Sequence, residues 1–308
     1  MNAPLKFVLS ASRRTDIPAF YMDWFMDRMD NGAFEVRNPY NGQIRHVIAT
    51  VHTVHTIVFW SKNFGPFLDG GYGERLKKMG FNLFFNFTLN SESKRLEPNV
   101  PPLSDRMDQL SELTAAYTPE SISWRFDPLC RYTTTPGDPM DNFGDFNKIA
   151  EHAGYLGITR CITSFMDLYP KIQKRIAKTQ ALSFLPVSIE EQGRILNDMQ
   201  SKLKARGLQL FACCEKQLLQ SLPQPSGIEA AACIPNDLLM RLFGGDLSLK
   251  KDSGQRVSSG CGCKISVDIG AYDQHPCFHN CLYCYANPSA PFNKEKIHRS
   301  SGATGGNG

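Results

Sequence analysis

Three cysteines in the last quarter of the chain have a spacing that is typical of a metal cluster. Cys277, Cys281 and Cys284 are separated by three and then by two residues. Structural zinc sites prefer four ligands in paired knuckles, and this spacing does not divide into two pairs. Three thiolates on a 4Fe–4S cube leave one iron without a protein ligand, and that iron can bind a chelating substrate or cofactor. The spacing therefore favours a 4Fe–4S cluster, with zinc as the alternative.

Four further cysteines could form a second, closed metal site. Cys261 and Cys263 lie shortly before the first group, and Cys214 and Cys233 are candidates to join them. Four thiolates would hold either an auxiliary iron–sulfur cluster or structural zinc. The competing interpretation is that these are free cysteines, which pack as small hydrophobic residues. The other cysteines are interpreted as core residues or bystanders: Cys130, Cys161 and Cys213.

Charged side chains stand at the carboxyl ends of several short apolar runs of the sequence. Arg13 comes after the first run and Lys62 after the second, and Arg125 and Asp127 lie at the end of the fourth. Catalytic residues of a β/α barrel come from the carboxyl ends of its strands, so we expect these side chains to line an active site. Arg125 and Asp127 are also expected to pair with each other. Each of these residues also has a purely structural interpretation. Lys62 could be a solvated lysine at the end of its strand, and Arg13 or Arg14 could pair with Asp16 and stabilise the first loop.

Six apolar, β-branched or aromatic runs predict strands that alternate with helical patterns. The runs cover residues 7–10, 57–60, 83–89, 122–126, 161–165 and 208–213. Such an alternation implies right-handed crossovers and a parallel sheet. Apolar stripes predict helices over residues 20–29, 107–117 and 195–203, with Ser104 as an N-cap and Gly207 as a stop.

The predicted fold is α/β, a partial (β/α)6-type barrel, with a doubly wound open sheet as the alternative. Asn41-Gly42 between two short runs predicts a hairpin inserted over residues 34–50. We expect residues 1–245 to form the barrel. Residues 246–288 are predicted to be a linker and a cysteine-rich segment packed on the same domain, and the Gly/Ser-rich residues 289–308 a disordered tail.

The cysteine spacing, with the aromatic Tyr283 before the last cysteine, resembles the signature of radical S-adenosylmethionine enzymes. The resemblance implies a radical-SAM-like barrel in which Cys277, Cys281 and Cys284 hold a 4Fe–4S cluster at the mouth. It implies S-adenosylmethionine as a cofactor on the open iron, near Tyr283, and its reductive cleavage to a 5′-deoxyadenosyl radical. An electron donor such as flavodoxin or ferredoxin is an implied partner.

A likeness over nearly the whole chain is to the domain of unknown function family 1848. It rests on the segments SASRRTDIPAFY, RNPYN, VFWSKNFGPFL, WRFDPL and CGCKISVDIGAYDQHPCFHNCLYCYAN. That family is recognised by a radical-SAM-like cysteine cluster at the C-terminal rather than the N-terminal end, and its molecular function is unassigned. The position implies that the C-terminal segment folds back over the barrel mouth.

Two strand ends are also similar to those of spore photoproduct lyase and related radical S-adenosylmethionine proteins. The matching segments are SKN at residues 61–63 and RFDP at residues 125–128. The likeness implies that Lys62 contacts the cofactor carboxylate, where a cation suits the charge. The Gly-Gly-Glu that usually follows the second strand is absent. A DNA substrate would follow from this likeness by analogy alone.

Composition is that of a globular protein and does not identify a partner. Of the 308 residues, 42% are hydrophobic and 21% are charged, with a net charge of +4. No apolar run approaches the ~20 residues of a membrane-spanning helix, and the N-terminus lacks a signal-peptide core, so we expect a cytoplasmic protein with no membrane partner. The weak net charge does not favour nucleic acid but leaves it open. His52 and His55 are predicted to be surface residues, and His279 a solvated loop residue or a neighbour of the cluster.

These patterns predict a radical S-adenosylmethionine-type enzyme that acts on an unidentified small molecule or macromolecule. One alternative is a non-catalytic iron–sulfur or zinc protein that uses the cysteines structurally or to sense redox state. A second is DNA-lesion repair by the same radical chemistry, which would need a basic groove and room for an extruded nucleotide.

Overall fold

The computed structural model describes residues 5–38, 41–134, 138–179 and 182–287. The strands are β1 Phe7–Ala11, β2 Ala33–Arg37, β3 Ile44–Ile48, β4 Val54–Ser61, β5 Asn82–Thr88, β6 Ile122–Arg125, β7 Arg131–Thr133, β8 Met140–Asp141, β9 Arg160–Thr163, β10 Ser183–Leu185, β11 Gln209–Ala212, β12 Glu229–Ala230 and β13 Val267–Asp268. The helices are α1 Ile17–Phe20, α2 Met22–Asp30, α3 Gly65–Asp69, α4 Tyr72–Lys78, α5 Leu103–Ala116, the 3-10 turn η1 Pro119–Ser121, α6 Phe146–Tyr155, α7 Pro170–Thr179, α8 Ile189–Lys204, α9 Lys216–Ser221 and α10 Asn236–Phe243.

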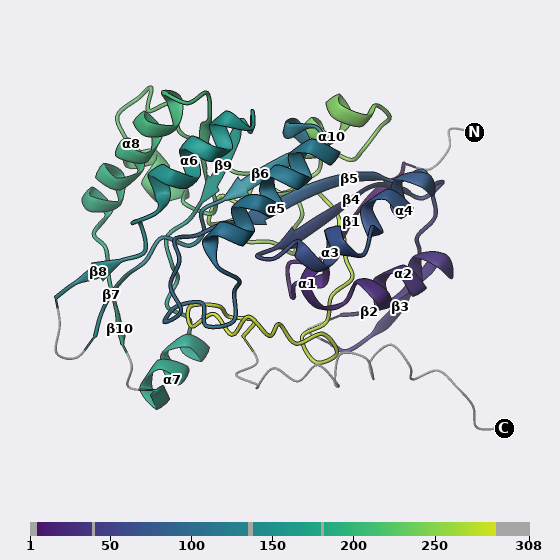
Figure 1. The fold of residues 1–308 in the computed structure, drawn as a ribbon, viewed down its shortest axis with the longest axis horizontal. Helices are drawn as coiled ribbons and strands as arrows, with labels where there is room; N and C mark the ends of the chain where they lie inside the picture. The colour runs from purple at the N-terminus through teal and green to yellow at the C-terminus, as the bar shows by residue number, and fades with distance from the viewer. Residues whose placement is uncertain (1–4, 39–40, 135–137, 180–181, 288–308) are drawn as a thin grey trace.

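The central element is an eight-stranded sheet in the order β12-β11-β9-β6-β5-β4-β1-β13, in which every neighbouring pair is parallel (Figure 1). All six predicted strands are present as β1, β4, β5, β6, β9 and β11. They follow one another across the sheet in chain order, so the order reversal of a doubly wound fold does not occur. Because β12 and β13 are its two edges, the sheet is open and does not close into a barrel.

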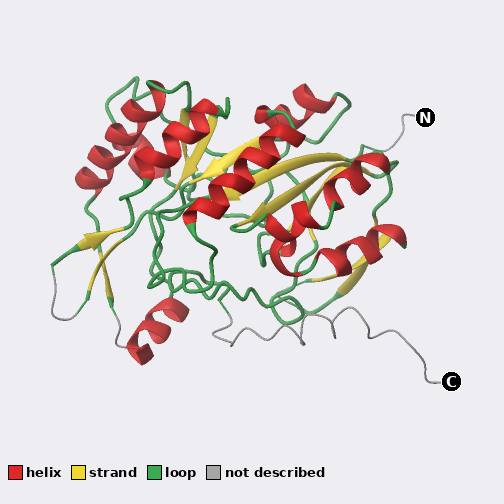
Figure 2. Cartoon of the chain, viewed as in Figure 1, coloured by secondary structure: helices red, strands yellow, loops and turns green. Residues whose placement is uncertain are grey.

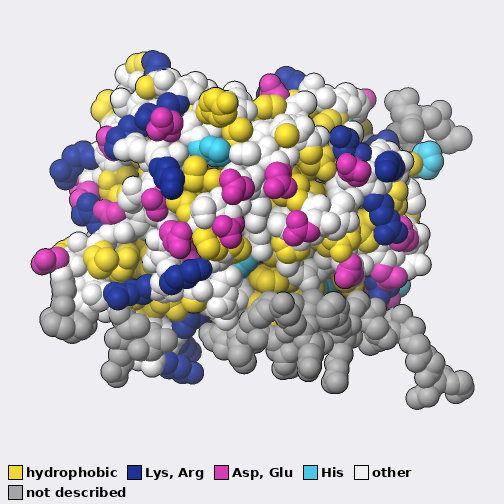
Figure 3. All heavy atoms as spheres, in the orientation of Figure 1, with side chains coloured by type: hydrophobic (Ala, Val, Ile, Leu, Met, Phe, Trp, Pro, Cys, Tyr) yellow, Lys and Arg dark blue, Asp and Glu magenta, His cyan; other side chains and the backbone are white. Residues whose placement is uncertain are grey.

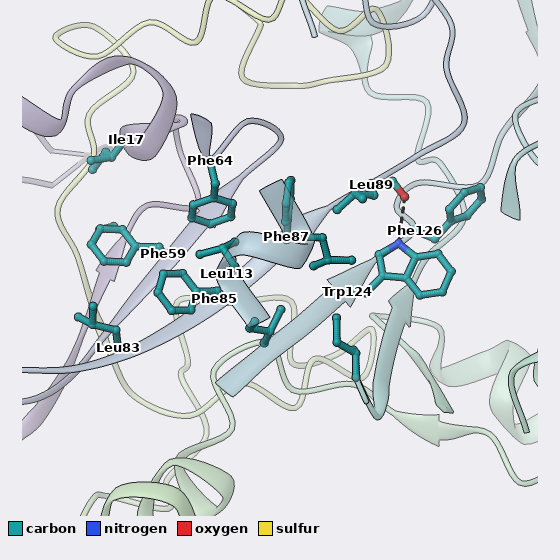
Figure 4. Close-up of a cluster of buried hydrophobic side chains, with 14 of the residues drawn as sticks. Ile17, Phe59, Phe64, Leu83, Phe85, Phe87, Leu89, Leu113, Trp124 and Phe126 are labelled. Atoms are coloured by element: carbon teal, nitrogen blue, oxygen red, sulfur yellow. Dashed lines mark hydrogen bonds between the residues drawn. The ribbon is translucent and has the colours of Figure 1, made fainter. Parts of the chain in front are cut away.

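One face of the sheet is covered by helices and holds an aromatic core (Figures 2 and 4). The strand β4 is buried along almost its whole length, as expected for a parallel strand that is covered on both faces. Phe59, Phe85 and Phe87 point from the strands towards Leu113 of α5 (Figure 4). The indole of Trp124 is fully buried and donates to the Leu89 carbonyl at 3.0 Å, which satisfies its polar atom within the core.

The opposite face of the sheet is covered by α10 and by two loops that carry cysteines. Val58, Phe84 and Ile162 face this side and pack in one cluster with Leu239 of α10. The same cluster contains the cysteines Cys213, Cys214, Cys233, Cys261 and Cys263. The second predicted group of cysteines therefore lies on the face of the sheet that the main layer of helices leaves open.

The predicted hairpin is confirmed. Strands β2 and β3 pair antiparallel, with Ala33 opposite Ile48 and Arg37 opposite Ile44. Gly42 has a φ of 71°, a left-handed conformation that glycine adopts without strain and that such a turn requires.

The C-terminal segment, residues 246–287, is joined to the first strand rather than folded apart. Its short strand β13 pairs in parallel with β1, and Ile269 and Phe278 are buried in the helix-side core. In Figure 1 the segment runs, in yellow, between α7 and the β2–β3 hairpin. The predicted tail, residues 289–308, lies outside the described residues.

Three local predictions have clear outcomes. Gly207 follows α8 with a φ of 76°, as predicted for a helix stop. Ser104 is not the N-cap of α5, because the helix begins one residue earlier, after Pro102. The surface prediction is right for His52 but wrong for His55, which is buried because the turn at Gly244 covers the start of β4 and accepts a hydrogen bond from its ring at 2.7 Å.

No helix in the described ranges combines the length and the apolar character that crossing a membrane would require.

Candidate functional site

The three cysteines of the first group lie on one loop, residues 276–287, which contains neither helix nor strand. Cys281 is buried, and Cys277 and Cys284 are partly buried. Asn280 has a φ of 54°, which asparagine tolerates better than most residues. The Cys284 N–H donates to the Cys281 carbonyl at 3.1 Å, and this bond closes a tight turn between the last two cysteines. We call Cys277, Cys281 and Cys284 the triad.

The triad loop is fixed to the carboxyl ends of β1 and β4 through a buried carboxylate. Asp16 accepts hydrogen bonds from the Ser61 hydroxyl at 2.7 Å and from the Lys62 backbone N–H at 2.8 Å. It also faces the ring of His279 at 2.8 Å. His279 is therefore a buried anchor of the loop and not a solvated residue. This bond explains how residues far apart in sequence meet at the strand ends.

Lys62 lies in a buried ion pair behind the triad loop. Its ammonium is 2.7 Å from Glu97 Oε1 and 3.1 Å from the hydroxyl of Tyr283, which donates to the same carboxylate. Burial alone would raise the pKa of Glu97, but Lys62 and Arg106 outweigh it and lower this pKa to about 2. Asn90 donates to both Glu97 and Tyr283 and completes the network.

The ammonium of Lys62 also acts on all three thiols of the triad. Burial raises the pKa of Cys277, Cys281 and Cys284, and the charge of Lys62 opposes that rise at each of them. Burial disfavours an isolated thiolate, so a bound cation is the natural counter-charge for these sulfurs. The donor chemistry of the loop therefore fits a soft metal. Across the described ranges, however, no three His, Cys, Asp or Glu side chains converge as a ready-made metal site.

Two arginines at other strand ends flank one indole ring. The guanidinium carbons of Arg13 and Arg125 each lie 5.4 Å from the ring centroid of Trp60. Arg125 pairs with Asp127, as predicted, and Asp127 also accepts a hydrogen bond from Ser164. These groups occupy the carboxyl ends of β1, β4, β6 and β9.

The Arg–Asp pair that was the structural alternative for the first loop does not form, because Asp16 turns towards β4 and the triad loop. Arg13 instead donates to the Ser266 hydroxyl at 3.2 Å, and Arg14 donates to the Gly270 carbonyl at 2.9 Å. Both arginines are therefore used to hold the C-terminal segment.

The second group of cysteines comes together and includes a member that the sequence did not indicate. Cys213 Sγ lies 3.7 Å from Cys214 Sγ and 4.0 Å from Cys233 Sγ. Cys261 and Cys263 pack in the same buried cluster, where the remaining interactions join Cys214 to Cys261, Cys261 to Cys263, and Cys263 to Cys233. Cys130 and Cys161 are buried, as predicted for core residues.

Glu97 is a residue of the candidate site that the sequence did not indicate. It lies in an irregular stretch between β5 and α5, where it is one polar residue among many. Only the folded chain places it beside Lys62 and Tyr283, so no local pattern could have singled it out.

The pattern of the family described as "Domain of unknown function (DUF1848)" matches this chain over residues 8–286. The match therefore spans the sheet, the second group of cysteines and the triad loop. No curated protein matches the sequence.

Proposed function

The chain belongs to the DUF1848 family, for which no function is described, and we propose that it is a radical S-adenosylmethionine-type iron–sulfur enzyme. Cys277, Cys281 and Cys284 would hold a 4Fe–4S cluster. The observation that carries the proposal is the contact between the Lys62 ammonium, at the carboxyl end of β4 in a parallel sheet, and Tyr283 of the triad loop, whose hydroxyl lies 3.1 Å away. From this position the charge of Lys62 acts on all three thiols. That edge is where β/α proteins carry their chemistry.

The open sheet supports this proposal at the level of the fold. Six of its strands follow one another in chain order, as in a partial (β/α)6-type barrel. We infer that the triad loop, tied to β1 and β4 through Asp16 and His279, covers the mouth of that partial barrel.

The chain's own residues would hold the cofactors and exclude water. Bound at the triad, a 4Fe–4S cluster would supply the electron that cleaves S-adenosylmethionine. The ammonium of Lys62 has three N–H donors, and its contacts with Glu97 and Tyr283 occupy two of them. The third donor suits a cofactor carboxylate, because the Lys62 side chain keeps 15% of its surface exposed.

The polar groups next to this network are suited to orienting a substrate. The amide of Asn90 bonds Glu97 and both backbone atoms of Asp127, N–H and C=O, so the two regions are held in a fixed relation. Arg13, Arg125 and Asp127 would contact the substrate or the loop above it. Reduction would require an external donor such as flavodoxin or ferredoxin.

The decisive experiment compares the wild-type chain, Cys281→Ala and the matched control Cys161→Ala after anaerobic reconstitution with iron and sulfide. Cys161 is equally buried but lies in β9. We expect wild type and the control to carry about four more irons per chain than Cys281→Ala. Both should change their electron paramagnetic resonance spectrum when S-adenosylmethionine is added, and both should release 5′-deoxyadenosine on reduction. A cluster at the triad that never cleaves the cofactor would refute the enzyme proposal.

The same samples test the two alternatives. Stoichiometric zinc at the triad, without iron, would identify a non-catalytic metal protein. DNA-lesion repair has less support, because acidic and basic side chains are interspersed on the face shown in Figure 3. A binding assay with damaged duplex DNA would test it directly.

A further inference from the structure

The second group of cysteines forms a closed ring of contacts. The ring runs from Cys213 to Cys214, then to Cys261, Cys263 and Cys233, and returns to Cys213. These sulfurs come from three separate parts of the chain, namely the end of β11, the loop after β12 and the C-terminal segment. They belong to a different buried cluster from Cys281 and Cys284, so the ring is distinct from the triad.

The backbone is specialised at two points of the ring. Cys214 has a φ of 62°, a left-handed conformation that costs a residue other than glycine about 1 kcal/mol or more. Neighbouring side chains of an extended strand point to opposite faces, so this conformation allows both Cys213 and Cys214 to face the ring. Strain of this kind persists where the surrounding structure uses it.

Position 262, between Cys261 and Cys263, requires glycine because the backbone here passes close to that of Ala231. The Gly262 N–H donates to the Ala231 carbonyl at 3.0 Å, and a Cβ at this position would lie 2.6 Å from the same oxygen. The N–H of Lys264 donates to the Ile234 carbonyl at 3.1 Å. These contacts hold Cys261 and Cys263 alongside Cys233.

Two cations act on the ring. Arg125 is buried and its Nη1 lies 2.6 Å from Cys233 Sγ, and the charge of the partly buried Arg13 interacts with Cys263. Each arginine has a carboxylate on its other side, Asp127 or Asp268. Neutral thiols would not need such partners, whereas four thiolates around a divalent centre carry a net charge of about −2. The surroundings therefore suit an anionic thiolate centre.

We propose that Cys214, Cys233, Cys261 and Cys263 form a second metal site, a closed set of four thiolates for zinc or for the iron of a 4Fe–4S cluster. Each of Cys214 and Cys233 contacts one member of the Cys-Gly-Cys pair, whereas the contacts of Cys213 are with Cys214 and Cys233 themselves. Coordination replaces the contacts between thiols by metal–sulfur bonds and releases a proton from each thiol.

The test uses the full chain with all three triad cysteines changed to alanine, so that any bound metal belongs to the second site. The protein is purified without oxygen, and separate portions are incubated with zinc chloride or with ferrous iron and sulfide. We expect this variant to retain either about one zinc or about four irons with four sulfides per chain. Which of the two is retained decides the metal. A variant with neither would overturn the proposal.

A further pair of substitutions assigns the ligands. Cys261→Ser with Cys263→Ser, added to the triad variant, should abolish metal binding, whereas Cys161→Ser should not. Unchanged metal content in the double serine variant would overturn the proposal.

If that protein does not fold, X-ray absorption of the triad variant gives the same answer without further substitution. Four sulfur neighbours at about 2.3 Å are expected around zinc or iron, and a shell of nitrogen and oxygen would overturn the proposal. Neither result depends on the triad, so failure of this site and failure of the proposed radical chemistry are distinguishable.

Discussion

Charged residues at the strand ends are buried in pairs, and this pairing determines what single substitutions do. Lys62 with Glu97 is nearly shielded from water, and Arg125 with Asp127 only partly exposed. Removing one partner of such a pair leaves an uncompensated buried charge, which destabilises far more than loss of a surface pair. Besides the chemical roles that we propose for them, these residues therefore stabilise the fold, and an activity assay must be accompanied by a stability measurement.

We expect stability to depend on pH through Glu97. Its pKa of about 2 in the folded chain lies below the ordinary value of 4.5, so the carboxylate stabilises the fold above pH 4.5. This contribution, about 3 kcal/mol, is lost as the pH falls from 4.5 towards 2. Glu97→Gln should therefore be less stable than wild type at pH 7. Its free energy of unfolding should fall less than that of wild type between pH 4.5 and pH 2.

Urea unfolding of both proteins between pH 2 and 7 measures the difference. Glu112→Gln, an exposed carboxylate of α5, is the control and should follow wild type. Parallel curves for Glu97→Gln and wild type would show that the ion pair does not titrate as stated.

At the level of elements, the sequence predicts the long apolar strands and misses the short strands that form only by pairing with a neighbour. The six predicted strands are present because parallel strands covered on both faces leave continuous apolar runs. Strands of two or three residues, such as β12 and β13, have no such signature and exist only because a longer strand lies beside them. The triad is local and visible as a spacing. The cysteine ring and the Lys62–Glu97 ion pair both join residues that are far apart in the sequence. The cysteines could be suspected from their residue type, but nothing in the sequence indicates that Glu97 contacts Lys62.

Strand β13 attaches the C-terminal segment mainly through Asp268. Its carboxylate accepts from the hydroxyls of Ser10 and Ser12 and from the Arg13 N–H, at 3.0, 2.6 and 2.8 Å. Asp268→Ala leaves these donors without a partner, so we expect the free energy of unfolding to fall by roughly 2–4 kcal/mol. Chemical denaturation measures this change.

Asp273→Ala is the matched control for that substitution. It lies in the same segment, but its pair with Arg37 is solvent-exposed, so its removal should cost less than about 1 kcal/mol. Equal effects of the two substitutions would mean that β13 is not the point of attachment.

Over the whole molecule, the C-terminal segment contacts residues at the carboxyl ends of β1 and β4, and the sheet is parallel and open where a partial barrel was expected. The segment supplies an edge strand, two buried side chains of the helix-side core and five of the ten cysteines. An extra strand on β1 occupies the edge at which a barrel would have to close. Because the sheet and the segment share one core, they should unfold together.

The three tryptophans make this cooperativity measurable. The Trp24 ring lies 4.1 Å from that of His275 and reports on the C-terminal segment, whereas Trp124 is buried in the sheet core. Two variants, each keeping one of these tryptophans and carrying phenylalanine at the other positions, should each show the same midpoint by fluorescence and by circular dichroism during thermal unfolding. A Trp24 signal that changes well before the circular dichroism of the same variant would show that the segment detaches first, as a separate unit. Coincident midpoints in both variants would show that the cysteine-bearing segment and the sheet form one cooperative structure, so that binding of the proposed metal would stabilise the whole chain.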